Sequence, residues 1–136
     1  GADDCLGLIA TKPGNEGKVI IVSDDKDLKT IPGKLYRPMA DEMLTITEAD
    51  ADKSFFTQVL TGDATDGYKG IPGIGPKKAE AILGARPHWG AVEQAYIKAG
   101  MTRDDAIQQA RLARILRWSD WHEEIQEIRL WTPTTK

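Results

Sequence analysis

The stretch from Gly70 to Leu83, GIPGIGPKKAEAIL, constrains the fold of this chain more than any other. Gly73 and Gly75 allow a tight backbone turn, and Pro76 suits the first turn of a following helix. That helix carries three apolar residues that can pack inward: Ala79, Ile82 and Leu83. The spacing predicts a helix-hairpin-helix, in preference to an ordinary glycine turn between two helices.

The same hairpin predicts contact with a phosphate backbone. Gly70, Gly73 and Gly75 let another backbone approach without a Cβ in the way, and the N–H groups at the helix start are free to donate. Lys77 and Lys78 add positive charge. Because such contacts read no bases, we expect sequence-independent, salt-sensitive binding to duplex DNA.

Carboxylates form three clusters along the chain: Asp3 and Asp4; Asp24, Asp25 and Asp27; and Asp63 and Asp66. Asp25 and Asp27 follow the run KVIIV, where extended backbone would send alternate side chains the same way. Asp63 and Asp66 are three apart and would share one face of a helical turn. Carboxylates are ligands for Mg²⁺ or Mn²⁺, and two such ions can clamp both reacting oxygens of a phosphodiester. Any one pair alone is more often a cap or turn, so only the three clusters together predict metal.

Composition excludes several other classes of protein. The 136 residues carry a net charge of −3 and one cysteine, Cys5, which leaves no internal disulfide or structural zinc site. We expect Cys5 to be a buried thiol. No membrane span or signal peptide is recognisable, which favours the cytoplasm.

The negative net charge does not exclude DNA as a partner, because carboxylates that hold metal ions also count toward that net charge. His88 and His122 lie away from the acidic clusters and predict no histidine site.

Periodicity predicts an α/β fold, with a small mixed or parallel sheet flanked by helices and a mostly helical C-terminal part. Expected helices cover residues 2–10, 47–60, 76–83, 89–99 and 102–118, and expected strands cover 18–22, 34–37, 43–46 and 124–131. The strand 18–22 should be buried on both faces, and the last strand is also compatible with a helix over 121–128. Three arginines recur every three residues and share a helix face that follows DNA or faces solvent: Arg111, Arg114 and Arg117. The tryptophans fit core packing better than base stacking.

Several segments together resemble the 5′ nuclease family, which includes flap endonucleases, the 5′ nuclease domains of bacterial DNA polymerases, and phage 5′-3′ exonucleases. They are ADDCLG, IIVSDDKDLKTIPG, GDATDGYKGI, AGMTRDDAIQQARLARILRW and EIRLW, and they cover nearly the whole chain. The likeness is strongest to exonucleases of short-tailed bacteriophages. It implies a PIN-like nuclease fold, hydrolysis of DNA to 5′-phosphate products, and a place in phage DNA replication in the host cytoplasm.

The resemblance also implies a role for six aspartates. Asp3 and Asp25 would hold the ion at the scissile phosphate, Asp27 and Asp66 the neighbouring ion, and Asp4 and Asp63 would support these ligands. Asp24 falls where the family pattern leaves the residue free. The resemblance further implies two Mg²⁺ or Mn²⁺ ions, a K⁺ ion on the hairpin carbonyls, and no small-molecule cofactor.

Departures from the family pattern concern the N-terminus. Gly1 stands where the motif has glutamate, and the resemblance implies that the preceding part of the fold lies outside this sequence. The resemblance therefore implies that residues 1–60 are the C-terminal part of the nuclease core, and 61–136 the hairpin region with a final strand returning to that core. We expect duplex DNA with a 5′ end or flap as the partner, and weak or absent cleavage by this chain alone.

Two other functions remain open at this point. A non-catalytic DNA-binding module would use the hairpin alone. A phosphohydrolase acting on small phosphate esters would use only the aspartates at the strand end.

Overall fold

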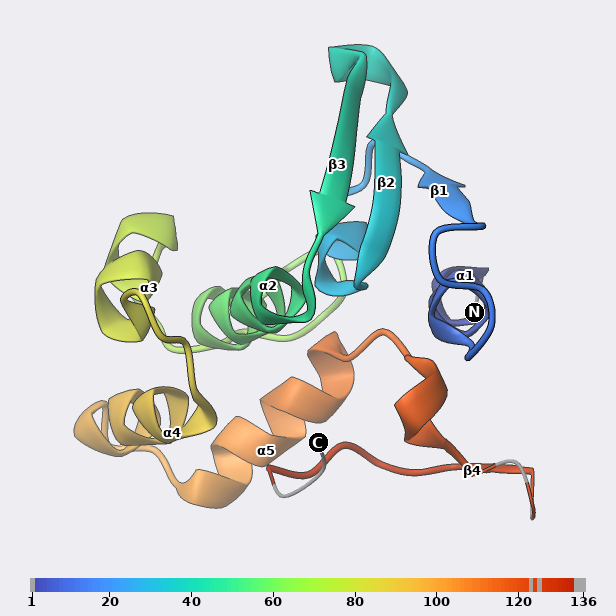
Figure 1. Cartoon of the computed structure of the whole chain (residues 1–136). Helices are drawn as coiled ribbons and strands as arrows, with labels where there is room; N and C mark the ends of the chain where they lie inside the picture. The colour runs from blue at the N-terminus through green and yellow to red at the C-terminus, as the bar shows by residue number, and fades with distance from the viewer. Residues whose placement is uncertain (1, 123, 125, 134–136) are drawn as a thin grey trace. The chain divides into compact units, whose positions relative to one another are not determined.

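The computed structural model describes residues 2–122, 124 and 126–133. The chain forms two compact units, coloured along the sequence in Figure 1. The first unit comprises Gly1–Ala51 and Ile115–Leu130, and the second comprises Asp52–Arg114 and Trp131–Lys136. The chain has both helices and strands, as the sequence predicts.

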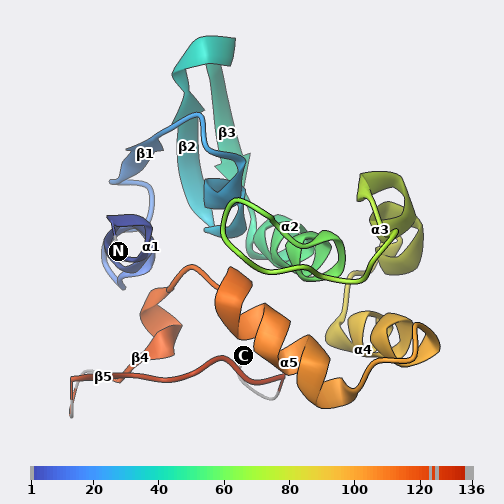
Figure 2. The ribbon, with the colours of Figure 1, turned by 180° about the vertical axis from the view of Figure 1, so that it is seen from behind.

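The described part of the first unit combines the helix α1, a three-stranded sheet, a two-stranded sheet and short 3-10 helices. Its elements are α1 (Ala2–Thr11), β1 (Ile20–Val22), η1 (Lys26–Thr30), β2 (Gly33–Arg37), η2 (Pro38–Ala40), β3 (Glu42–Ile46), η3 (Trp118–Asp120), β4 (Trp121–His122) and β5 (Glu127–Ile128). Figures 1 and 2 both show α1 beside β1. The predicted first helix and the strands 34–37 and 43–46 are therefore confirmed to within one residue at each end.

The three-stranded sheet of the first unit is mixed. β1 pairs with β2 in parallel, and β2 pairs with β3 antiparallel, which sets Ile21 opposite Leu35 and Leu35 opposite Leu44. Ile21 and Leu35 lie in a buried cluster completed by Leu28, Ile31, Ile46, Ala51 and Ile115. Ile20 and Val22 are 49% and 62% exposed. The expectation that β1 is buried on both faces is thus wrong, because only the face with Ile21 packs against this cluster.

Four helices dominate the second unit: α2 (Glu48–Thr61, whose first turn precedes the unit boundary), α3 (Pro76–Leu83), α4 (Trp89–Lys98) and α5 (Arg103–Ala113). Capping residues fix their starts: the hydroxyl of Thr47 accepts from the Asp50 N–H, and Pro76 occupies the first turn of α3. Gly84 ends α3 with a positive φ of 63°. These helix starts agree with the sequence prediction.

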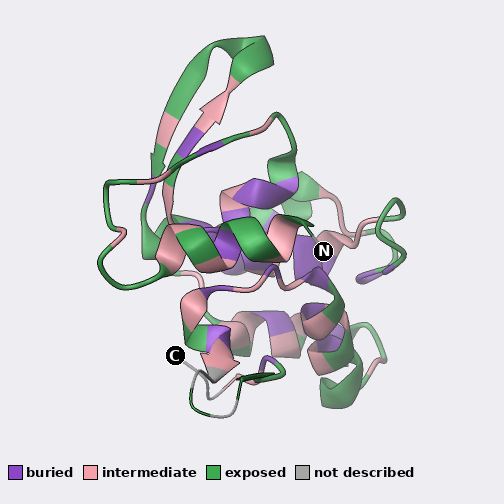
Figure 3. Ribbon diagram, turned by 90° about the vertical axis from the view of Figure 1, so that its right-hand side faces the viewer, coloured by how far each residue is buried: buried purple, intermediate pink, exposed green. Residues whose placement is uncertain are grey.

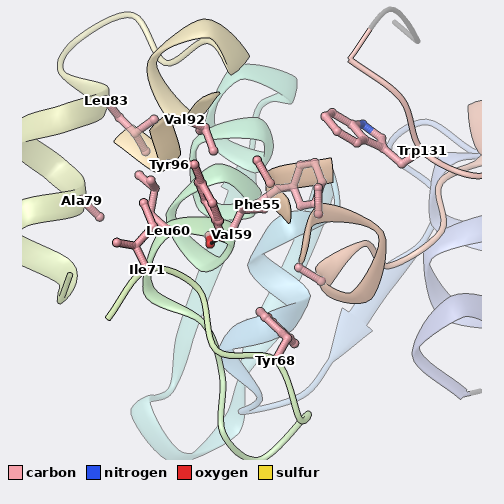
Figure 4. Packing of buried hydrophobic residues seen from close by; sticks show 13 residues of the cluster. Phe55, Val59, Leu60, Tyr68, Ile71, Ala79, Leu83, Val92, Tyr96 and Trp131 are labelled. Atoms are coloured by element: carbon pink, nitrogen blue, oxygen red, sulfur yellow. Dashed lines mark hydrogen bonds between the residues drawn. The ribbon is translucent and has the colours of Figure 1, made fainter. Parts of the chain in front are cut away.

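The second unit has its own hydrophobic core, which Figure 4 shows from close by. Phe55, Val59 and Leu60 of α2 meet residues of the other helices, namely Ala79, Leu83, Val92, Tyr96, Ala106 and Ala110. Trp131 is buried and stacks edge-on against Phe55 and Trp89. The expectation of core packing is confirmed for Trp131.

α5 is shorter than predicted. Thr102 and Asp105 form a capping box at its start, as the Thr102 cap anticipates, but the helix ends at Ala113 and Arg114 is extended. Beyond it, the Leu116 N–H donates to Asp4 Oδ1 at 3.0 Å. The prediction of a helix to residue 118 is wrong because this tertiary bond takes a donor that a longer helix would need.

The C-terminal strand is also shorter than predicted. Among its described residues, only Glu127 and Ile128 are in strand pairing, antiparallel to His122 and Trp121. The alternative helix over residues 121–128 is wrong for the described part of that range, because both ends of it are in strand pairing; residues 123 and 125 lie outside the described residues.

Cys5 is exposed, so the expectation of a buried thiol is wrong. It lies on α1, where the buried position is Gly7. Among the described residues, no helix is both long enough and apolar enough to cross a membrane.

Replacing Tyr96 with phenylalanine should destabilise the second unit. The buried Tyr96 hydroxyl donates to the Val59 carbonyl, and burial followed by the charge of Asp105 raises the pKa of Tyr96. The variant leaves that carbonyl without its donor, at a cost of about 1–3 kcal/mol. Because the folded pKa exceeds the unfolded one, the Tyr96 contribution is complete below pH 10 and declines as pH rises through the folded pKa. Urea unfolding between pH 7 and pH 11 measures both effects, and an unchanged midpoint would contradict them.

Candidate functional site

The acidic segment after β1 is a tight turn that leads into a 3-10 helix. Asp25 is the N-cap of η1, and its Oδ1 accepts the Asp27 N–H at 2.9 Å. The Asp25 N–H in turn donates to the Ser23 hydroxyl at 3.1 Å. Asp25 is extended, with φ −68° and ψ 120°, but Asp27 lies within η1, so the expectation that both side chains alternate along extended backbone is wrong. Asp25 stays exposed and Asp27 is only 8% exposed.

Buried contacts hold the far end of this segment. Leu28 lies in the core at 1% exposure, and the Thr30 hydroxyl donates to the Asp27 carbonyl at 2.8 Å. The buried Arg117 guanidinium donates to the Thr30 carbonyl at 2.9 Å. The backbone that carries Asp27 is therefore fixed by its neighbours.

The first acidic cluster lies on α1, as predicted. Asp3 and Asp4 are both half-buried. Asp4 binds the Leu116 N–H, and α1 packs closely at Gly7, where an added Cβ would lie 2.0 Å from the Leu116 carbonyl oxygen. The Thr11 hydroxyl also accepts the Trp118 N–H at 2.7 Å. Asp4 thus has a structural contact that the sequence does not reveal.

Asp63 and Asp66 lie in the turn after α2. Asp63 pairs with Tyr68 in an isolated antiparallel bridge, and its Oδ1 accepts the N–H groups of Thr65 and Asp66 at 2.9 and 3.4 Å. One carboxylate oxygen of Asp63 and one of Asp66 lie within 4.8 Å of each other. The predicted helical turn is wrong, because the Asp63 side chain closes a non-helical turn. The two carboxylates nevertheless lie close together.

A hollow of about 430 Å³ opens beside this turn. Its lining consists of Thr61, Gly62, Asp63, Ala64, Gly67, Tyr68 and Lys69. Lys69 is exposed at its edge. An acidic and a basic residue, Asp63 and Lys69, thus both line this hollow.

A glycine-rich segment, residues 70–75, connects this turn to α3. Gly70 is buried with φ 62°, and its N–H donates to Gln109 Oε1 of α5 at 2.8 Å. Gly75 is the N-cap of α3 and offers no side-chain cap, so the first N–H groups of the helix lack that partner. Lys77 and Lys78 are exposed beside them. This arrangement leaves a positive helix start accessible to an anion.

The predicted arginine face does not form. Arg111 donates to the Trp131 carbonyl, Arg114 lies over the Phe55 ring at 5.0 Å, and Arg117 is buried outside α5. Neither a DNA-following face nor a solvated face describes them, because each guanidinium has a partner within the protein.

Sequence reasoning missed two residues that hold the site. Gln109 accepts a hydrogen bond from Gly70, which lies 39 positions earlier in the chain. Arg117 donates a hydrogen bond to Thr30 of η1, which lies 87 positions earlier. A glutamine or arginine in an otherwise helical pattern carries no local signal of such a long-range bond. Only co-variation of these pairs would have found them.

The donor chemistry fits a hard divalent cation. Carboxylate oxygens make up all three clusters, which suits Mg²⁺ or Mn²⁺ and not a soft metal. Asp3, Asp4, Asp25 and Asp27 belong to the first unit, and Asp63 and Asp66 to the second.

Comparison with curated proteins finds similar nucleases. The chain is 35% identical to an exonuclease of Escherichia phage T7 and 33% identical to an exodeoxyribonuclease of Enterobacteria phage T3; each match covers 96% of the chain and 55% of the relative. It is 30% identical to the flap endonuclease Xni of Shewanella woodyi, over 82% of the chain and 50% of the relative. The chain thus spans about half the length of these relatives. No family model and no solved structure matches it significantly. The likeness to phage exonucleases and a flap endonuclease extends over most of the sequence, and the chain belongs to the 5′ nuclease family.

Proposed function

We propose that this chain is the metal-binding and DNA-binding portion of a 5′-3′ exonuclease or flap endonuclease that hydrolyses DNA phosphodiesters. The observation that carries the proposal is the pair of close carboxylates of Asp63 and Asp66, directly followed by the glycine-rich hairpin and an uncapped helix start. The names of the relatives, exonuclease, exodeoxyribonuclease and flap endonuclease, support the same activity.

In this proposal the aspartates bind two Mg²⁺ or Mn²⁺ ions. Asp3 and Asp25 hold the ion at the scissile phosphate, Asp27 and Asp66 hold its neighbour, and Asp4 and Asp63 support them. Bound divalent ions would supply charge neutralisation at the phosphate and a more acidic water. The burial of Asp27 and the turn closed by Asp63 limit the directions these carboxylates can take.

The hairpin in this proposal holds the duplex away from the cut site. The backbone from Gly70 to Gly75 and the N–H groups at the start of α3 contact phosphates, and Lys77 and Lys78 add charge. A K⁺ ion on the hairpin carbonyls would be an additional contact of the same kind. The binding is therefore independent of sequence.

The test uses the protein encoded by the complete reading frame that contains this sequence. With Mg²⁺, it should release short products from the 5′ end of labelled duplex or flap DNA, and EDTA should stop the release. An intact label after prolonged incubation with Mg²⁺ would overturn the nuclease proposal.

A second function, a DNA-binding module without catalysis, is favoured by one observation: the hairpin lies in a unit with its own core. It predicts that the chain binds duplex equally well with Mg²⁺ and with EDTA while no cleavage occurs in the complete protein. Cleavage that depends on Mg²⁺ would exclude it.

Replacing Lys77 and Lys78 together with alanine should weaken duplex binding roughly 10-fold and lower the slope of log affinity against log salt by about 2. Both side chains are exposed, so folding should be unaffected. Fluorescence anisotropy titrations at salt concentrations from about 50 to about 200 mM measure both the affinity and its salt dependence. The double variant Lys18→Ala with Lys34→Ala removes the same charge from exposed positions of the first unit and serves as the control. Equal loss in both double variants would show a general charge effect and contradict the prediction.

A further inference from the structure

The tip of the β2–β3 hairpin is bound to the acidic segment through one residue, Asp24. Its Oδ1 accepts the Met39 N–H at 2.9 Å, and its carbonyl oxygen accepts from Arg37 Nη2 at 3.1 Å. The neighbouring Ser23 N–H donates to the Tyr36 carbonyl at 3.0 Å, which extends the parallel pairing by one residue. Side chain and main chain of Asp24 therefore both attach to the hairpin.

A hydrogen bond within the β2–β3 hairpin closes its tip. Tyr36 donates a hydrogen bond to Asp41, which closes the tip with φ 47°. Figure 3 shows the far end of this hairpin exposed on its surface, and Met39 is 89% exposed. Because so little packing holds the tip, its hydrogen bonds to Asp24 account for its attachment to the acidic segment.

Asp24 lies directly before the two proposed metal ligands of this segment, Asp25 and Asp27. Asp25 follows Asp24 in the chain, and its carboxylate orientation is defined by its bond to the Asp27 N–H. Arg117 and Leu28 hold the segment on its other side. Without the Asp24 bonds, the segment would keep its attachment at Ser23, but the residue directly before Asp25 would lose its contacts with the hairpin tip.

We propose that Asp24 is a positioning residue, which clamps the hairpin tip to the acidic segment and thereby orients the carboxylates of Asp25 and Asp27. Its role requires a hydrogen-bond acceptor and not a negative charge. The link to metal binding rests on the function proposed above, whereas the clamp itself does not.

Two substitutions separate the acceptor from the charge. Asp24→Asn keeps an Oδ1 acceptor and removes the charge, and Asp24→Ala removes both. Met39→Ala keeps the N–H donor and removes only an exposed side chain, so it is the matched control. The first measurement is amide hydrogen exchange at Met39 and Asp27, and the second is Mn²⁺ affinity by electron paramagnetic resonance.

Asp24→Ala should speed amide exchange at both positions and weaken Mn²⁺ binding roughly 3- to 10-fold. Asp24→Asn and Met39→Ala should each stay within about 2-fold of the unmodified chain in both measurements. Equal loss of Mn²⁺ affinity in the asparagine and alanine variants would show that the charge matters and overturn the proposal. Unchanged exchange at Asp27 in Asp24→Ala would overturn it as well.

Failure of the proposed function gives a different result. If the unmodified chain binds no Mn²⁺, the metal role of these aspartates fails. Exchange at Asp27 still responds to Asp24→Ala if the clamp orients the segment, and stays unchanged if it does not.

Discussion

Asp66→Ala should lower the rate of Mg²⁺-dependent DNA cleavage by roughly 10²- to 10³-fold in the complete protein. In the proposed site, Asp66 holds one of two ions, and its loss removes a ligand at the reacting phosphate. The side chain is exposed, and the turn is closed by the Asp63 carboxylate and not by that of Asp66. Stability should therefore change by less than about 0.5 kcal/mol.

The measurement is single-turnover cleavage of 5′-labelled duplex, with unfolding by urea as the companion. Asp104→Ala is the matched control, because Asp104 is an exposed aspartate in the first turn of α5. Asp25→Ala is less informative, since it also removes the cap of η1. A rate for Asp66→Ala equal to that of the control would remove Asp66 from the active site.

Gly70→Ala should destabilise the second unit by about 3 kcal/mol or more, from strain at positive φ together with overpacking. The added Cβ would lie 2.4 Å from the Gly62 nitrogen and 2.6 Å from the Leu60 carbonyl oxygen. Both neighbours are backbone atoms, so no side-chain rotation relieves the clash. The partly buried hydrogen bond to Gln109 would be strained as well.

Gly75→Ala, in the same glycine-rich segment, is the control for Gly70→Ala. Gly75 has φ −98°, and a Cβ there meets no atom within 4 Å. Its cost should be about 1 kcal/mol, from the weaker N-cap. Urea unfolding followed by tryptophan fluorescence compares the two, and equal midpoints would mean that the hairpin relaxes around Gly70.

Residues with strong local preferences made much of the fold predictable. Thr47, Pro76 and Thr102 stand at helix starts because their capping or φ preferences act within a few positions. The inward face of α3 followed from spacing alone, and Ala79 and Leu83 are buried as expected. Local rules sufficed wherever the controlling interaction was itself local.

Other parts of the site depended on distant partners. The end of α5 is set by the bond between Asp4 and the Leu116 N–H, 112 positions apart. The spacing predicted Arg117 on a helix face, yet its side chain is buried and donates a hydrogen bond to the Thr30 carbonyl. Asp25 and Asp27 were expected to alternate along extended backbone, but a side-chain cap folds that segment into η1. Periodicity carries no information on such contacts.

Close packing at Gly7 has an evolutionary consequence. With an added Cβ placed 2.0 Å from the Leu116 carbonyl oxygen, this position is closed to every larger residue unless the backbone at 116 moves too. Descendants that lose the neighbouring aspartates should therefore still retain glycine here. An invariant glycine at position 7 would then reflect the packing of α1 against Leu116, and it would not indicate that a relative has kept catalytic activity.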